Sequence, residues 1–135
     1  MVREEEIQQK YAYFQMLQQQ IEQITQQVEL MQQHTVDLEE SSAAIEELAI
    51  AQVGGEVLAP IANGIFMKAT LQESTTLLVN VGANTVVEKN SGQVLELLQE
   101  QKKELALRLV EAEEILQQLT NQAMKVYKEV EEHIR

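Results

Sequence analysis

Apolar residues recur at alternating steps of three and four along residues 7–45, which is the heptad period of a coiled coil. With Ile7 at heptad position a, nine of the twelve a and d sites are apolar, and glutamine and glutamate fill most outer positions. The pattern predicts one long helix over residues 1–52. Gly54 and Gly55 follow it, and glycine readily terminates a helix.

The same pattern returns over residues 95–133, with the d series ending at His133. Asn90 or Ser91 is placed to cap this second helix, with Gln93 completing a capping box from Asn90. The two apolar seams have equal length, so an antiparallel pairing sets Phe14 opposite Val126. The same register sets Tyr13 opposite Tyr127, and the sequence therefore predicts an antiparallel helical hairpin.

The middle of the chain changes to short β-branched and apolar runs. We expect four strands, over residues 57–61, 65–71, 77–81 and 85–89. Ala62-Asn63-Gly64 and Gly82-Ala83-Asn84 separate them pairwise, and both asparagine and glycine tolerate the positive φ of a tight turn. Residues 53–91 are therefore predicted to form two β-hairpins.

Together these elements predict a mainly α fold: a long antiparallel coiled-coil hairpin with two central β-hairpins, forming one domain over residues 1–135. The helices occupy residues 1–52 and 92–135. Four short strands with apolar faces leave open edges that the chain itself does not cover, so we expect them to pair with strands of other subunits. The residues predicted to serve this oligomerisation are Val57, Leu58, Ile61, Ile65, Met67, Leu71, Leu77, Val79, Val81 and Val87.

Charge and composition narrow the range of partners. The chain has 22 acidic and 10 basic residues, a net charge of −12, which disfavours binding to nucleic acid or anionic lipid. It has no cysteine and no apolar run of the length that a membrane span requires, and its acidic start is unlike a signal peptide. We therefore expect a soluble protein of the cytoplasm.

Aromatic residues gather where the two helices are expected to have their free ends. Tyr11, Tyr13 and Phe14 lie near the start of the first helix, and Tyr127 lies near the end of the second. A surface of this kind can bind varied apolar segments of other proteins, and flexible methionine side chains help it to adapt to them. The candidate residues for binding are Ile7, Tyr11, Tyr13, Phe14, Met16, Leu17, Met124, Tyr127 and Val130. For Phe14, Leu17 and Val126 the other interpretation is that they close the helical seam.

The order of elements, helix, two hairpins and helix, resembles the alpha subunits of the prefoldin family over the whole chain. The segments that carry the resemblance are Val57-Leu58-Ala59-Pro60-Ile61, Lys68-Ala69, Leu78-Val79-Asn80-Val81-Gly82-Ala83 and Val86-Val87-Glu88-Lys89. The family commonly has Gly-Ala-Gly in both turns, where this chain has Ala62-Asn63-Gly64 and Gly82-Ala83-Asn84.

The resemblance implies a hexamer of two alpha and four beta subunits, whose hairpins join into a β-barrel platform. It also implies an ATP-independent chaperone that holds unfolded client proteins at the ends of the coiled coils and passes them to a group II chaperonin. The nine candidate residues would then be client-binding residues.

Catalytic motifs give no competing hypothesis. The sequence contains no phosphate loop, no dinucleotide-binding glycine turn and no His-Glu-x-x-His, so we expect neither an enzyme nor a cofactor or metal site. The alternatives are a structural or adaptor coiled-coil subunit, or a homo-oligomeric scaffold or filament built through the same strands, without client binding.

Overall fold

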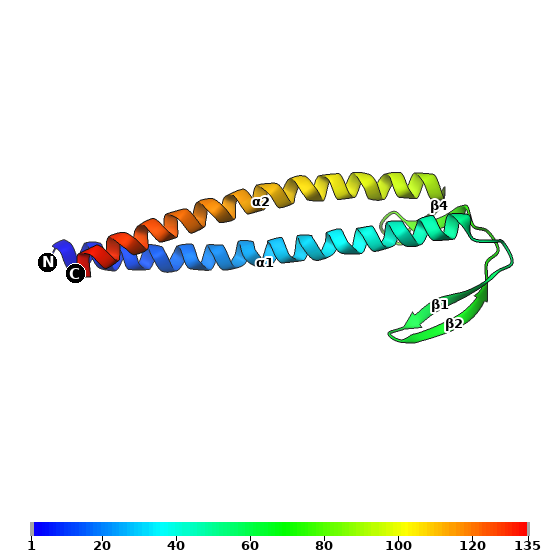
Figure 1. The fold of residues 1–135 in the computed structure, drawn as a ribbon, viewed down its shortest axis with the longest axis horizontal. Helices are drawn as coiled ribbons and strands as arrows, with labels where there is room; N and C mark the ends of the chain where they lie inside the picture. Colours follow the sequence, from blue (N-terminus) through cyan, green and yellow to red (C-terminus); the bar gives the residue numbers. More distant parts are fainter. Residues whose placement is uncertain (1, 135) are drawn as a thin grey trace. The chain divides into compact units, whose positions relative to one another are not determined.

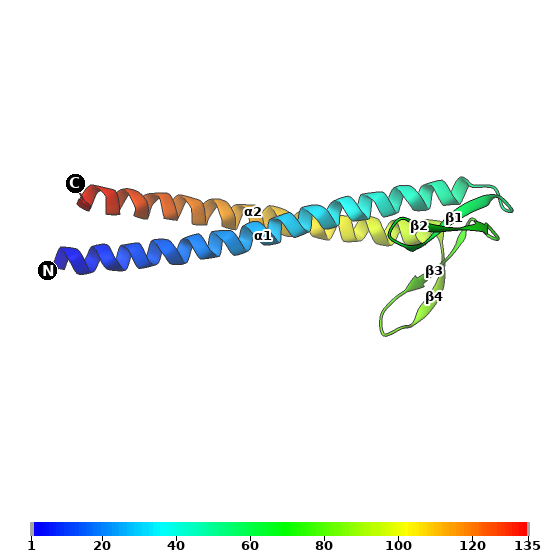
Figure 2. The same cartoon turned by 90° about the horizontal axis from the view of Figure 1, so that it is seen from below.

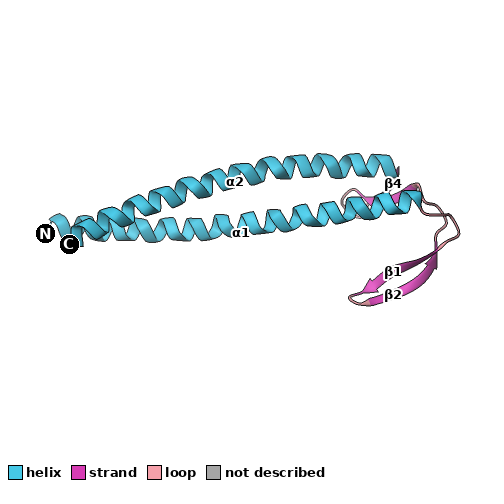
Figure 3. Cartoon of the chain, in the orientation of Figure 1, coloured by secondary structure: helices cyan, strands magenta, loops and turns pink. Residues whose placement is uncertain are grey.

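The computed structural model describes the backbone of residues 2–134 and the side chains of residues 4–132. The elements in chain order are α1 (Val2–Ile50), β1 (Glu56–Ala62), β2 (Ile65–Thr70), β3 (Thr76–Asn80), β4 (Val86–Asn90) and α2 (Ser91–Ile134), as drawn in Figures 1 and 3. The predicted fold class is confirmed, and each strand lies within one residue of its expected bounds. The chain divides into two compact units, one ending at Thr35 and resuming at Glu104, the other covering Val36–Lys103.

The heptad prediction is confirmed by burial along both helices. Every a and d side chain from Ile7 to Ile45 and from Leu95 to Val130 is buried or half-buried. The side chain of His133, the last predicted d residue, lies outside the described residues. Thr35 is a polar residue on this seam, and its hydroxyl donates a 2.9 Å hydrogen bond to the Met31 carbonyl within its own helix. A seam position can therefore be polar without leaving an unpaired hydroxyl.

In the first unit the ends of α1 and α2 pack antiparallel around a small apolar core. Leu17, Ala123 and Val126 are buried, and Phe14, Ile21, Leu119 and Val130 pack against them. The Lys10 amine lies 3.2 Å from a Glu129 carboxylate oxygen, which fixes the register within one residue of the predicted pairing. Burial of apolar area along this seam is what holds the two helix ends together.

The first hairpin, β1 with β2, pairs Leu58 with Lys68 and Pro60 with Phe66. The ladder shifts register between Pro60 and Ala62, and the turn beyond it is made by Gly64 at φ 77°. At the other end of the hairpin the Leu71 amide donates a 2.9 Å hydrogen bond to the Gly55 carbonyl. A two-stranded sheet has no second layer, and so Ile65 and Met67, which are predicted to serve oligomerisation, are exposed in the single chain.

The second hairpin, β3 with β4, forms its own two-stranded sheet, and Figure 2 shows these strands paired. Leu78 lies opposite Glu88 in the register. The Val81 amide donates to the Thr85 carbonyl and the Ser91 amide to the Thr75 carbonyl, each at 2.9 Å. These two hydrogen bonds continue the ladder at both ends of the strands.

Helix boundaries follow local hydrogen bonding. Asn90 and Gln93 form the predicted capping box: the Gln93 amide donates to Asn90 Oδ1 at 2.8 Å and the Asn90 amide to Gln93 Oε1 at 3.1 Å. Helix α1, in contrast, ends at Ile50 rather than at residue 52. The reason is that Gly54, at φ 86°, donates its amide to the Leu71 carbonyl and already belongs to the first hairpin.

Candidate functional site

The paired helix ends of the first unit carry a concentration of exposed apolar side chains. Five large ones remain between two-fifths and three-fifths exposed although they adjoin the core: Tyr11, Tyr13, Met16, Met124 and Tyr127. The helical pattern explains this exposure, because none of the five occupies an a or d position of the seam. They are therefore free to contact another molecule without opening the seam.

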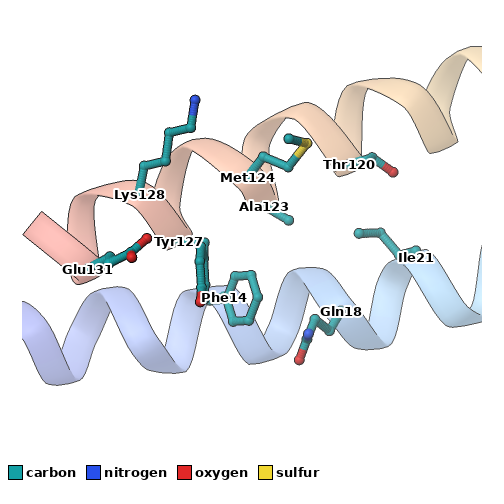
Figure 4. A pocket seen from close by; sticks show the side chains of 9 residues that line it. All are labelled: Phe14, Gln18, Ile21, Thr120, Ala123, Met124, Tyr127, Lys128 and Glu131. Atoms are coloured by element: carbon teal, nitrogen blue, oxygen red, sulfur yellow. The ribbon is translucent and has the colours of Figure 1, made fainter.

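A groove lies between the two helix ends, with a volume of about 570 Å³. Its walls come from both helices, as Figure 4 shows, and are mainly apolar. The lining residues are Phe14, Gln18, Ile21, Thr120, Ala123, Met124, Tyr127, Lys128 and Glu131. A concave apolar surface of this kind can contact an inserted side chain from two sides.

Tyr127 organises the aromatic end of this groove. Its ring centroid lies 5.8 Å from that of Phe14, with the planes tilted by 42°. This distance and tilt fall in the range that favours aromatic pairs. The same two rings, with Tyr11 and Val130, line a smaller and more enclosed hollow of about 190 Å³.

Charged residues contribute to the larger groove and connect the two helix ends. Lys128 and Glu131 lie at the rim of the groove, and the Lys10–Glu129 ion pair crosses between the helices beside them. Its two side chains are 34% and 38% exposed, so water screens much of the attraction. The border is polar and mixed in sign, while the floor is apolar.

The structure places the predicted binding residues in three environments. Tyr11, Phe14, Met124, Tyr127 and Val130 line the two hollows. Ile7 is half-buried, and Leu17 is only 1% exposed, which makes it the most buried side chain of the core. Tyr13 and Met16 are exposed but line neither hollow.

The expected pairing of Tyr13 with Tyr127 is wrong, because the ring in contact with Tyr127 is that of Phe14. Tyr13 precedes the a residue Phe14, whereas Tyr127 follows the d residue Val126. In an antiparallel pair these two positions lie on opposite flanks of the seam, although their numbers suit the register. The two tyrosines therefore offer two separate surfaces.

Several groove residues were not predicted. Gln18, Ile21, Thr120, Ala123, Lys128 and Glu131 complete its lining. The available signal was Ala123, a small residue at an a site whose neighbouring a sites in α2 are occupied by the larger Leu116 and Val130. When a seam position holds a small side chain, space remains there, and the neighbouring side chains line this space without filling it.

The hairpins of the second unit carry a separate apolar surface. Of the residues predicted for oligomerisation, Leu58, Ile61, Ile65, Met67 and Val81 are exposed, and the other five are half-buried: Val57, Leu71, Leu77, Val79 and Val87. Phe66, Leu78 and Val86 were not predicted and are exposed by 57%, 72% and 55%. Exposed apolar patches of this kind are typical of surfaces that bind another protein.

The described residues contain neither a metal-ligand cluster nor a helix suited to span a membrane. No three histidine or acidic side chains in that part of the chain lie close enough together to hold a metal ion. Neither described helix has an apolar stretch of the length that crossing a bilayer requires.

Comparison with known proteins agrees with this architecture. The sequence profile of the prefoldin subunit family matches residues 4–134. The chain is 31% identical to the prefoldin subunit alpha of Methanoculleus marisnigri, over 93% of this chain and 84% of that subunit. It is 24% identical to that of Archaeoglobus fulgidus, over 94% of this chain and 93% of that subunit.

A third match, to the prefoldin subunit alpha of Thermofilum pendens, has 27% identity and covers 52% of this chain and 54% of that subunit. The fold is also similar to that in the cryo-EM structure of filamentous PFD from Methanocaldococcus jannaschii, with a TM-score of 0.75 at 19% identity. That match covers 86% of this chain and 96% of the other. The chain therefore belongs to the prefoldin family of non-enzymatic chaperone subunits, whose members form oligomers with other prefoldin subunits.

Proposed function

We propose that this chain is a subunit of an ATP-independent holdase that binds non-native proteins at its paired helix ends. The observation that carries the proposal is the apolar groove bordered by Phe14, Met124 and Tyr127, beside further exposed tyrosines. Unfolded chains expose apolar side chains that are buried in their native state. A mainly apolar groove with a polar rim is complementary to such segments and selects no particular sequence.

The binding free energy available at one pair of helix ends is small, and this favours several subunits acting together. An aromatic side chain buries about 150–250 Å² when covered, so five half-exposed side chains offer on the order of 500 Å². At about 25 cal/mol per Å² this area contributes at most on the order of 10 kcal/mol. Association itself costs about 4–15 kcal/mol, which leaves weak binding for one pair of helix ends. Several such sites in one assembly would raise the overall affinity by effective concentration.

The proposed partners are those of the prefoldin family. We infer that the two hairpins join this chain to beta subunits in a hexamer of two alpha and four beta subunits. The exposed apolar residues on the strands support this role. We further propose that the assembly works in the cytoplasm and delivers its clients to a group II chaperonin, which completes folding.

A second candidate is a homo-oligomeric or filamentous scaffold that binds no client. The similarity in fold to filamentous PFD and the open strands of both hairpins favour it. Mass measurement of the purified chain, with and without a prefoldin beta subunit, separates the two architectures. A defined mixed hexamer is expected, and an open-ended series of masses without the beta subunit would favour the scaffold.

The function itself is tested by aggregation of a chemically denatured test protein after dilution from denaturant. The assembled protein is expected to suppress light scattering without nucleotide, at a stoichiometric ratio to the client. Subsequent addition of a group II chaperonin and ATP should restore client activity. An assembly of correct mass that leaves aggregation unchanged would contradict the holdase proposal and support the scaffold.

A further inference from the structure

The groove at the paired helix ends is lined by one continuous stripe of side chains from each helix. On α2 the lining residues recur at helical spacing from Thr120 to Glu131, and on α1 they do so from Phe14 to Ile21. Such spacing keeps side chains on one face of a helix. At 1.5 Å per residue, the stretch from Thr120 to Glu131 is about 16 Å long, which is about three helical turns. The groove therefore runs along both helices, as Figure 4 shows, and has the length of a short helical segment.

The heptad positions that flank the seam on the groove side carry no charge. In an antiparallel helix pair the e positions of both helices lie on the same flank, and in two-stranded coiled coils these positions are often charged. Along the groove and the smaller hollow they hold Tyr11 and Gln18 on α1 and Thr120 and Tyr127 on α2. Helices that face the core of a bundle have just this extension of the seam from a and d to e. The flank is therefore a surface against which a third helix can pack.

An extended segment would fit this groove less well than a helix, because the groove offers few partners to a bare backbone. Along most of its length the backbone groups of α1 and α2 are bonded within their own helices. The Thr120 hydroxyl already donates a 2.8 Å hydrogen bond to the Leu116 carbonyl, and Lys128 and Glu131 lie at the rim. An extended chain on the apolar floor would lose water from its amides and carbonyls without gaining hydrogen bonds. A helix bonds these groups within itself and presents only side chains.

The charge of the helix ends indicates which polar face such a helix would carry. Residues 4–21 and 120–132 include six glutamates and three lysines. One of these lysines, Lys10, is paired with Glu129, so the remaining groups are acidic by a wider ratio. Complementary charge selects partners and speeds their association. The surface around the groove therefore favours lysine and arginine on a partner over aspartate and glutamate.

From these observations we propose that the groove binds a segment of the client as an amphipathic helix with a basic polar face, packed as a third helix against α1 and α2. The apolar side chains of that segment, at steps of three and four residues, enter the groove. Ala123 is 6% exposed at its base and leaves room for one large side chain. The basic side chains stay in water near the glutamates. The inference rests on the holdase function proposed above and names the class of client segment that this site prefers.

Labelled peptides of one composition test the conformation of the bound segment. The first peptide, of about 18 residues or five helical turns, contains leucine, lysine and alanine with the leucines at helical spacing. The second contains the same residues with leucine and lysine alternating, as in a strand. The full-length chain in its assembled form should bind the first roughly tenfold more tightly by fluorescence anisotropy, because only a helix satisfies its own backbone in the groove. Isotope-edited infrared spectroscopy should show that the bound first peptide is helical.

A third peptide tests the charge of the polar face. It has the helical spacing of the first peptide but glutamate in place of every lysine. Like-charge repulsion from the helix ends should weaken its binding roughly fivefold at low salt, and the difference should narrow as salt is raised. An equal affinity of the lysine and glutamate peptides at low salt would show that the polar face is not selected.

Two arginine substitutions test whether the helical peptide occupies the groove. Gln18 and Gln20 are both exposed on α1, but only Gln18 lines the groove, and Gln20 lies on the opposite flank. Gln18→Arg places a long basic side chain in the groove and should weaken binding of the first peptide roughly fivefold. Gln20→Arg adds the same charge to the same helix end and should change it less than about twofold.

The inference would be overturned if the alternating peptide bound as tightly as the helical one, if the bound peptide were not helical, or if the two arginine variants had equal effects. If the assembly still suppresses aggregation of the denatured test protein in that case, the holdase proposal stands and only the class of segment is wrong. Failure to bind any of the peptides, together with unchanged aggregation, would refute both proposals.

Discussion

Replacing Met124 with serine tests whether the groove is the surface that holds a client. Met124 lines the groove and is 56% exposed, so its outer half contributes little to the helical seam. Burying a whole methionine side chain stabilises by about 1.5–3 kcal/mol, and covering the exposed half by a client therefore contributes about 1 kcal/mol. Met124→Ser should weaken binding about fivefold at each pair of helix ends. If two copies of the site engage one client, the effects multiply to about 25-fold.

The matched control is Met16→Ser. Met16 is similarly exposed, at 45%, and lies near the same helix ends, but it lines neither hollow. A client side chain on a convex flank contacts one helix only, whereas one in the groove contacts two. We therefore expect the control to weaken binding less than twofold. Both substitutions should leave the helix melting temperature and the mass of the assembly unchanged.

The assay is a titration of the assembly against a labelled, denatured test protein, read by fluorescence anisotropy and by suppression of light scattering. Equal losses for the two serine variants would show that clients bind the general apolar surface of the helix ends. An unchanged Met124→Ser affinity, with assembly intact, would refute the reasoning from the groove.

Three further predictions concern stability, measured by unfolding the protein with heat and with urea and following the circular dichroism signal of its helices. Asn90→Ala should destabilise by about 0.5–2 kcal/mol because it removes the oxygen that caps α2, whereas the exposed mid-helix change Asn121→Ala should be nearly neutral. Leu17→Ala should lower stability by about 2–5 kcal/mol, since it empties the most buried position of the core, and a loss below about 1 kcal/mol would contradict its placement. Lys10→Met should raise the melting temperature by a few degrees, because a screened ion pair on the seam contributes less than about 1 kcal/mol and methionine buries more apolar area.

The fold was predictable because each of its elements has a local signal. The heptad seam identified most of the buried residues of both helices, and the expected start of the second helix lies within one residue of the start of α2 at Ser91. The end of α1 was not predicted correctly, since Ile50 carries no terminating signal. The Gly54 amide donates a hydrogen bond to the Leu71 carbonyl, and this contact ends the helical region. The residues next to Gly54 in sequence do not predict a contact with a residue so far along the chain.

The candidate site was predictable in position but not in shape. Heptad counting placed Tyr11, Phe14, Met124 and Tyr127 near the helix ends, and the structure brings these four into two adjoining hollows. Counting alone paired Tyr13 with Tyr127 because it considered position along the seam and not the flank. The groove also depends on Ala123, whose side chain is too small to fill its position on the seam. Hydrophobic patterning counts alanine simply as apolar and therefore does not reveal the space beside it.

The hairpins show a further limit of apolar patterning, and its physical reason. Leu58 and Leu78 have similar surroundings in sequence, both are exposed, and each lies near the middle of its strand. They differ in the backbone beside them. Leu58 is followed closely by Pro60, which has no backbone N–H group, whereas every residue of β3 around Leu78 has one. Side-chain hydrophobicity sets how strongly a surface favours association, whereas the free donors and acceptors decide which edge can accept a strand. Which strand edge of these hairpins could accept a further strand therefore depends on the phase of the hydrogen bonds, which requires the register of each hairpin to be known.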